Sequence, residues 1–190
     1  MAYTQAVASL KSLTPYSQSR HHSTPHLDKE IERDYELRTW AERLHVNTKG
    51  NVFIPPGAFT NSILESAKFL SIQIPGKGKA TYTKHFEAGV RVIEPLTLSI
   101  KKADVKPEEL FLNSDGKRGG GKRVIRYYPR IDSWEGDVTY WVTDATITQD
   151  VFERVLEASG TLIGIGRFRP RNLGFYGRFE VINLVWRSIT

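Results

Sequence analysis

The sequence contains no cysteine, which excludes disulfide bonds, thiolate metal sites and cysteine nucleophiles. This absence is compatible with a reducing compartment. No apolar run approaches the length that crosses a bilayer, and residues 1–13 lack the basic and apolar regions of a secretory signal peptide. We therefore expect a cytoplasmic protein with no membrane partner.

The motifs of nucleotide-dependent enzymes are also missing. Glycine and basic residues alternate in 76–79 and 116–123, but no Gly-Lys-Ser/Thr closes a G-x-x-x-x-G run there, which excludes a P-loop NTPase. Gly164-Ile165-Gly166 is not followed by a third glycine at the dinucleotide-binding spacing. No carboxylate or cysteine stands at a recognised ligand spacing from the histidines, so we expect neither a metal nor another cofactor.

What remains is the composition of a folded domain. Hydrophobic residues make up 39% of the chain and charged residues 25%, a balance that favours a packed core over disorder. A length of 190 residues suits one domain. We therefore predict a single domain over 1–190, with a polar loop at 17–33 and basic, glycine-rich insertions near 76–86 and 115–123.

Hydrophobic periodicity predicts the order of the secondary structure. Strands are expected at Tyr3–Leu13, Val52–Ile54, Val90–Ile100 (with Pro95 as a bend or edge position), Glu109–Leu112, Val124–Tyr128, Val138–Thr143 and Arg178–Trp186. Helices are expected at Tyr35–Leu44, at Ala58–Leu70, and between Thr148 as N-cap and Gly160 as the C′ residue. This order is close to a β-α-β-β-α-β unit. We predict an α+β, ferredoxin-like fold in which two helices pack on an antiparallel sheet and basic loops are inserted.

The positive charge is concentrated in three segments. The formal net charge is +6, and the segments 76–86, 115–130 and 164–179 together hold 13 basic side chains and a single acid, Asp115. The rest of the chain holds 14 basic and 20 acidic side chains. Because clustered Lys and Arg side chains supply phosphate contacts, this distribution predicts a polyanionic partner. The alternative interpretation is a set of ordinary solvated loops.

The segment Gly164–Phe179 has the composition of a single-stranded nucleic-acid site. Arg167, Arg169 and Arg171 alternate with other residues, so in an extended chain they point to the same side. Phe175 and Tyr176 are rings on which a base can stack. The alternative is a hairpin whose arginines pair with acids of the same chain.

These segments define the candidate nucleic-acid-binding residues. They are Lys77, Lys79, Lys84, His85, Lys117, Arg118, Lys122, Arg123, Arg126, Arg130, Arg167, Arg169, Arg171, Phe175, Tyr176 and Arg178. RNA or single-stranded DNA is the expected partner, and no catalytic residue is assigned. The runner-up is a metal-independent ribonuclease of the Cas6 type, in which His21, His22 or His26 acts as general acid or base.

Two stretches resemble a known family. The helix entry Ile54-Pro55-Pro56-Gly57-Ala58-Phe59-Thr60-Asn61-Ser62-Ile63 resembles the region before the first helix of the RAMP superfamily of CRISPR-associated proteins. The segment Gly164–Phe179 is similar to the glycine-rich loop near the end of that fold. The nearest members in style are the Cas7-type backbone subunits, which hold guide RNA through basic residues on a ferredoxin-like, RRM-related core. Because those subunits are usually much longer, the resemblance implies a reduced, Cas7-like protein.

The whole chain also resembles small proteins of phages and prophages of proteobacteria, some of which inhibit type I CRISPR complexes. This resemblance implies a non-enzymatic RNA-binding phage protein in the host cytoplasm that acts as an anti-CRISPR. CRISPR effector subunits and a second copy of the chain are its further expected partners. A different class of function, a decoy that binds protein and touches no nucleic acid, is the remaining alternative.

Overall fold

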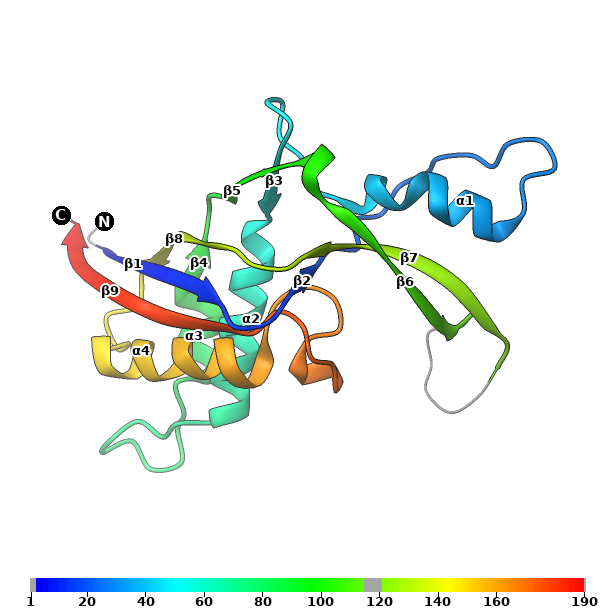
Figure 1. Ribbon diagram of the computed structural model, residues 1–190. Coiled ribbons are helices and arrows are strands. Elements are labelled where there is room, and N and C mark those ends of the chain that lie inside the picture. Colours follow the sequence, from blue (N-terminus) through cyan, green and yellow to red (C-terminus); the bar gives the residue numbers. More distant parts are fainter. Residues whose placement is uncertain (1–2, 115–120, 190) are drawn as a thin grey trace.

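The computed structural model describes residues 3–114 and 121–189. Its centre is an antiparallel sheet of four strands, β1 (Tyr3–Ser12), β4 (Val90–Val92), β8 (Glu135–Val142) and β9 (Phe179–Ile189), in the order β4-β8-β1-β9. The helices α2 (Pro56–Leu70) and α4 (Gln149–Ala158) lie on one face of this sheet (Figure 1). The chain order β1-α2-β4-β8-α4-β9, with β1 and β8 at the centre, is the ferredoxin-like arrangement and confirms the predicted fold class.

Alternation along the central strand decides which face is buried. Ala6 and Ala8 of β1 are fully buried, whereas Gln5, Val7 and Ser9, which alternate with them, are only half-buried. Ala6 lies between Tyr140 of β8 and Trp186 of β9 in the register. The ring of Phe152 on α4 packs against both of these aromatic side chains, which joins the helix layer to the sheet.

Two prolines and one glycine fix the ends of the helices. Pro55 precedes α2 in an extended conformation and Pro56 opens it, where a missing N–H is tolerated. Beyond α4 the chain continues as a π-helical turn, η3 (Ser159–Ile163). A Cβ atom at Gly160 in this turn would lie 2.2 Å from the carbonyl oxygen of Phe179, so only glycine allows β9 to approach so closely.

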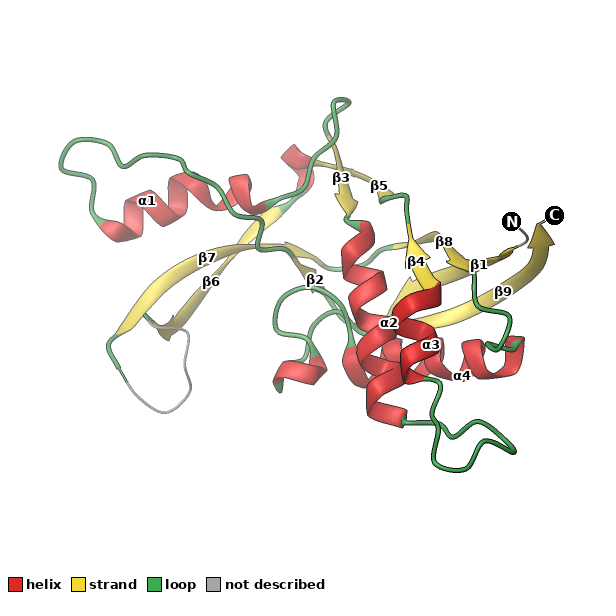
Figure 2. Cartoon of the chain, turned by 180° about the vertical axis from the view of Figure 1, so that it is seen from behind, coloured by secondary structure: helices red, strands yellow, loops and turns green. Residues whose placement is uncertain are grey.

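Two long insertions build a second unit beside the core. The strands β2 (Tyr16–Ser17), β6 (Lys106–Asn113) and β7 (Arg123–Ile131) form a sheet in the order β2-β7-β6. The helix α1 (Glu32–Thr39) and the 3-10 turn η1 (Trp40–Arg43) pack against β7. Figures 1 and 2 show this arm of α1, β6 and β7 extending away from the core.

The remaining elements are short. They are β3 (Asn51–Ile54), α3 (Thr83–Gly89), β5 (Leu96–Lys101), η2 (Lys102–Asp104) and η4 (Pro170–Asn172). The β-rich stretch Val90–Ile100 is divided into β4 and β5 around Pro95, the predicted bend or edge position, because proline cannot donate to a ladder. β5 then pairs with β3 instead of the central sheet. None of the helices in the described ranges has the length and apolar character needed to span a membrane.

Candidate nucleic-acid interface

The segment Gly164–Phe179 forms a loop that joins η3 to β9 and is tied to β2. The amide of Arg167 donates to the carbonyl of Ser17 at 3.0 Å, and the amide of Gly177 donates to the carbonyl of Pro15 at 2.8 Å. Gly177 has φ +73°, and a Cβ atom there would lie 1.9 Å from the carbonyl oxygen of Ile165. The loop is therefore a fixed element whose close approaches require glycine.

A pocket of about 510 Å³ opens between this loop and the N-terminal end of α2. It is lined by Tyr16, Gln18, Ser19, His45, Pro55, Gly57, Ala58, Asn61, Gly166, Arg167, Arg169 and Asn172. Two arginines are among these residues and no carboxylate is. The helix terminus adds partial positive charge, so the pocket suits an anion.

Arg167 is the most unusual of the predicted cations. Its guanidinium carbon lies 3.3 Å from the ring centroid of Tyr128 and 4.4 Å from that of Phe168. Its Nε atom is buried without a hydrogen-bond partner, and Arg167 forms no ion pair within residues 3–114 and 121–189. Burial lowers the pKa of Arg167, and the nearby Tyr128 side chain and Glu36 carboxylate offset this effect only in part. An arriving phosphate would supply the missing counter-charge.

Arg169 and Arg171 of the loop form ion pairs with α2. Arg169 donates to Glu65 at 2.7 Å, and the Arg171 side chain, 57% exposed, lies 3.8 Å from the same carboxylate. Glu65 stands one helical turn beyond Asn61, a pocket residue. This ion pair positions Arg169 at the pocket and neutralises part of its charge.

The second half of the loop faces the arm. Tyr176 donates its hydroxyl to Glu108 of β6 at 2.7 Å, and burial together with this contact raises the pKa of Tyr176 to about 12. Arg130 of β7 pairs with Glu108 at 3.0 Å and lies over the Tyr176 ring. Phe175 is 60% exposed, and Arg178 beside it donates to the backbone oxygens of Thr161 and Phe175.

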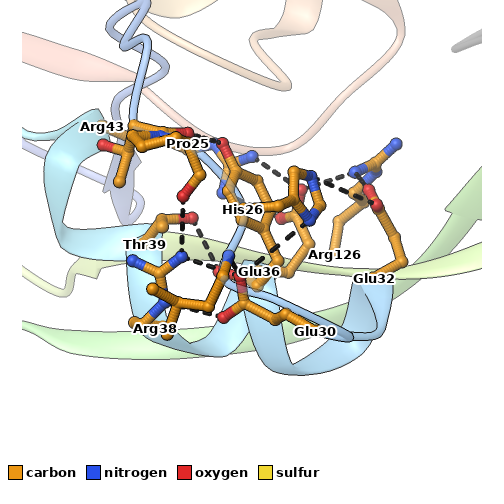
Figure 3. A network of polar contacts seen from close by, with 12 residues as sticks. Pro25, His26, Glu30, Glu32, Glu36, Arg38, Thr39, Arg43 and Arg126 are labelled. Atoms are coloured by element: carbon orange, nitrogen blue, oxygen red, sulfur yellow. Dashed lines mark hydrogen bonds and ion pairs between the residues drawn. The ribbon is translucent and has the colours of Figure 1, made fainter.

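Arg126 forms its ion pairs within the protein. Figure 3 shows its guanidinium between Glu32 and Glu36 of α1. The carboxylate of Glu36, only 1% exposed, also accepts two hydrogen bonds from Arg43, at 2.9 and 3.0 Å. Burial alone would raise the pKa of Glu36, but the bonds from Arg43 and Arg126 outweigh it and lower that pKa. This network of Glu32, Glu36, Arg43 and Arg126, here called the α1 clamp, holds α1 on β7.

The first basic segment lies away from the pocket. Lys77 and Lys79 follow the C-terminal end of α2, and the pocket adjoins its N-terminal end. A 15-residue helix separates the two places by about 22 Å. Lys84 is exposed on α3, and His85 beside it bonds to Asp144 at 2.7 Å. Lys77, Lys79, Lys84 and His85 therefore lie away from the pocket that contains Arg167 and Arg169.

The tip of the arm is also remote. Lys122 and Arg123 are exposed at the start of β7, and Arg123 lies over the ring of Phe111. Seven residues of extended chain place Arg123 about 23 Å from Arg130. Lys117 and Arg118 lie outside the described residues. Of the predicted residues, therefore, Arg167 and Arg169 line the pocket, Arg171 shares Glu65 with Arg169, and Arg130 and Tyr176 meet at Glu108.

The three histidines of the ribonuclease alternative lie in the loop before α1. His26 stacks on Tyr35 with ring centroids 3.7 Å apart, and its nearest carboxylate oxygen belongs to Glu30, at 3.9 Å. His22 contacts Thr24, and burial lowers the pKa of His22. No cluster of three metal-ligating side chains is found among the residues that the structure describes.

Sequence analysis did not single out three residues of the pocket. His45 and Gln18 are joined by a hydrogen bond from the His45 amide to the Gln18 side chain, at 2.6 Å. Burial lowers the pKa of His45, so its ring is neutral near pH 7. Asn61 was within the Pro-Pro-Gly helix entry but carried no signal of its own. Four separate segments contribute the pocket lining, which periodicity does not reveal.

Fold and site define a class, the ferredoxin-like α+β proteins with a basic, glycine-rich loop beside a helix N-terminus. No protein-family model matches the chain, and no curated protein matches it. Among solved structures, the chain is similar to the crystal structure of Cmr6 from Pyrococcus furiosus. The TM-score is 0.49 and the sequence identity 12%, over 95% of this chain and 98% of that one.

Proposed function

We propose that this protein binds RNA or single-stranded DNA without cleaving it, as a reduced, Cas7-like RAMP protein. The site is the pocket between α2 and the glycine-rich loop, with Arg130 and Tyr176 extending it toward the arm. The observation that carries the proposal is Arg167, a half-buried arginine whose Nε atom is buried without a hydrogen-bond partner and whose guanidinium has aromatic neighbours and no ion pair within the described ranges. A nucleic-acid phosphate is the counter-ion that fits beside a helix N-terminus.

Replacing Arg167 by glutamine tests this site. A charged hydrogen bond contributes about 1.5–3 kcal/mol, so affinity for a short single-stranded oligonucleotide should fall by roughly 10- to 150-fold. Fluorescence anisotropy with a labelled oligonucleotide measures this affinity. Arg154→Gln is the matched control, because Arg154 is an exposed arginine on α4 that does not line this pocket. Equal affinities of the two variants would refute the site.

The dependence of binding on salt tests the same proposal independently. Each phosphate contact on a single strand contributes a slope of about −0.7 in a plot of log K against log salt concentration. Arg171→Gln removes an exposed cation at the loop and should make the slope shallower by roughly that amount. A slope unchanged from the native protein, measured between two salt concentrations in the same assay, would exclude Arg171 as a phosphate contact.

We further propose that the protein inhibits a CRISPR complex, and only the sequence resemblance supports this role. It predicts that the purified protein inhibits target binding by a type I-C complex and that Arg167→Gln relieves the inhibition. The Arg167→Gln variant could instead inhibit the complex as well as the native protein does and remain bound to it after nuclease treatment. This result would favour the alternative function, a decoy that binds protein and touches no nucleic acid.

A further inference from the structure

The face of the central sheet opposite the helices carries one residue from each of its four strands in a single row. The register pairs Arg91 of β4 with Trp141 of β8, Trp141 with Gln5 of β1, and Gln5 with Arg187 of β9. Directly paired residues of an antiparallel sheet share a face. The adjacent positions, including Ala6, are buried on the helix side, so this row points away from the helices.

The middle of the row is aromatic and accessible. Trp141 is 39% exposed although it stands on a central strand. Tyr3 of β1 stacks on it with ring centroids 4.9 Å apart and an interplanar angle of 27°. Bases stack on such rings whatever their sequence, because every base has a π-face.

The ends of the row are cationic. Arg91 and Arg187 are both exposed, and neither pairs with a carboxylate in the described parts of the chain. Arg91 donates one N–H to its neighbouring carbonyl, that of Val90. The acid Asp137 on this face stands four residues from Trp141 along β8, about 13 Å away, and accepts a hydrogen bond from Ser9. That separation exceeds the screening length of about 8 Å at physiological salt.

We propose that this open sheet face, the row of Arg91, Trp141, Gln5 and Arg187 with Tyr3, is a second binding surface for single-stranded nucleic acid. A base adds to the Tyr3–Trp141 stack, and the phosphates on either side contact Arg91 and Arg187. The surface lies on the opposite side of the sheet from α2 and its pocket. The inference rests on the proposed function for its ligand class but uses no residue of the pocket.

Trp141→Leu is the principal test, because leucine keeps an apolar side chain in the strand and removes the stacking ring. Stacking contributes about 1–3 kcal/mol per base, which corresponds to an oligonucleotide affinity lower by roughly 5- to 150-fold. The double variant Arg91→Gln/Arg187→Gln should also weaken binding, and Arg154→Gln on the helix side should not. Circular dichroism and thermal unfolding of each variant establish that it is folded.

Photo-crosslinking gives a readout that does not depend on stability. An oligothymidine in which 5-bromouracil replaces thymine should crosslink to the peptide that contains Trp141 or the one that contains Tyr3. Crosslinks confined to 164–179, with full affinity in Trp141→Leu and weakened affinity in Arg167→Gln, would overturn this inference and leave the proposed function standing. A native protein that binds no oligonucleotide would overturn both.

The same face could instead pair two copies of the chain, and sedimentation distinguishes this outcome. A native dimer that becomes monomeric in Trp141→Leu, with oligonucleotide affinity unchanged, would show a protein interface and overturn the inference. The inference is supported if the native protein and Trp141→Leu sediment identically and only the variant binds the oligonucleotide more weakly.

Discussion

Replacing Glu36 by alanine should lower the free energy of unfolding by about 3–5 kcal/mol, the largest effect of any single substitution in the arm. The Glu36 carboxylate is 1% exposed and accepts hydrogen bonds from both Arg43 and Arg126. Without it, the partly buried guanidinium of Arg43 has no carboxylate partner among the described residues, and that of Arg126 keeps only Glu32. Denaturant titration followed by tryptophan fluorescence measures the change.

Glu32→Ala is the matched control for the α1 clamp. Glu32 pairs with the same Arg126, but its side chain is 49% exposed. An exposed ion pair contributes about 0–1 kcal/mol, so this variant should remain close to the native protein. A loss of stability as large as that of Glu36→Ala would show that burial of the carboxylate is not what stabilises the arm.

The same carboxylate predicts how stability depends on pH. The folded protein lowers the pKa of Glu36 from its ordinary value of 4.5. Stability from this group is therefore complete above pH 4.5 and is lost as the pH falls through the lowered folded-state pKa. In Glu36→Ala this part of the acid dependence should be absent. Parallel acid titrations of the two proteins measure it, and identical profiles would contradict the assignment.

Replacing Gly177 by alanine should both destabilise the protein and weaken oligonucleotide binding. The residue has φ +73°, and the left-handed backbone alone costs an L-residue about 1–2 kcal/mol. The new Cβ would lie 1.9 Å from the carbonyl oxygen of Ile165, so the parts of the loop around 165 and 177, which are joined by a hydrogen bond from the Ile165 amide, must move apart. Because the loop positions Arg167 and Arg169 at the pocket, the affinity for an oligonucleotide should fall together with the stability.

Gly57→Ala is the control for this substitution. Gly57 is in the first turn of α2, and a Cβ atom there meets nothing within 4 Å. Alanine at a helical glycine raises stability by about 0.4–1 kcal/mol, so this variant should unfold later than the native protein. Thermal unfolding compares the two, and a Gly177→Ala protein as stable as Gly57→Ala would show that the loop tolerates a side chain at 177.

The fold was largely predictable because its elements carry local signals. The Pro55-Pro56 entry marks the start of α2, and alternation along β1 marks the strand whose buried face holds Ala6. Pro95 marks the division between β4 and β5, and what periodicity missed was the early start of α1 at Glu32. The apolar spacing that suggested Tyr35–Leu44 belongs in its second half to the 3-10 turn η1, which packs on β7.

The candidate site was less predictable, because residue type does not say what a charge will meet. Arg126 and Arg169 were predicted as nucleic-acid contacts on the same grounds as Arg167. In the fold, Arg126 meets Glu36 and Arg169 meets Glu65, whereas Arg167 meets the rings of Tyr128 and Phe168. Trp141 and Arg91 belong to no basic segment and acquire a common face only through strand pairing.

By itself, the sequence determined the α+β composition, the β-α-β-β-α-β order and the concentration of positive charge in three segments, because these properties depend on neighbours along the chain. Only the tertiary structure decided which cations are neutralised within the protein and which remain available. The reason is physical: a guanidinium's partner is chosen by distance in space, and Glu36 and Arg126, 90 residues apart in sequence, are in hydrogen-bond contact in the fold.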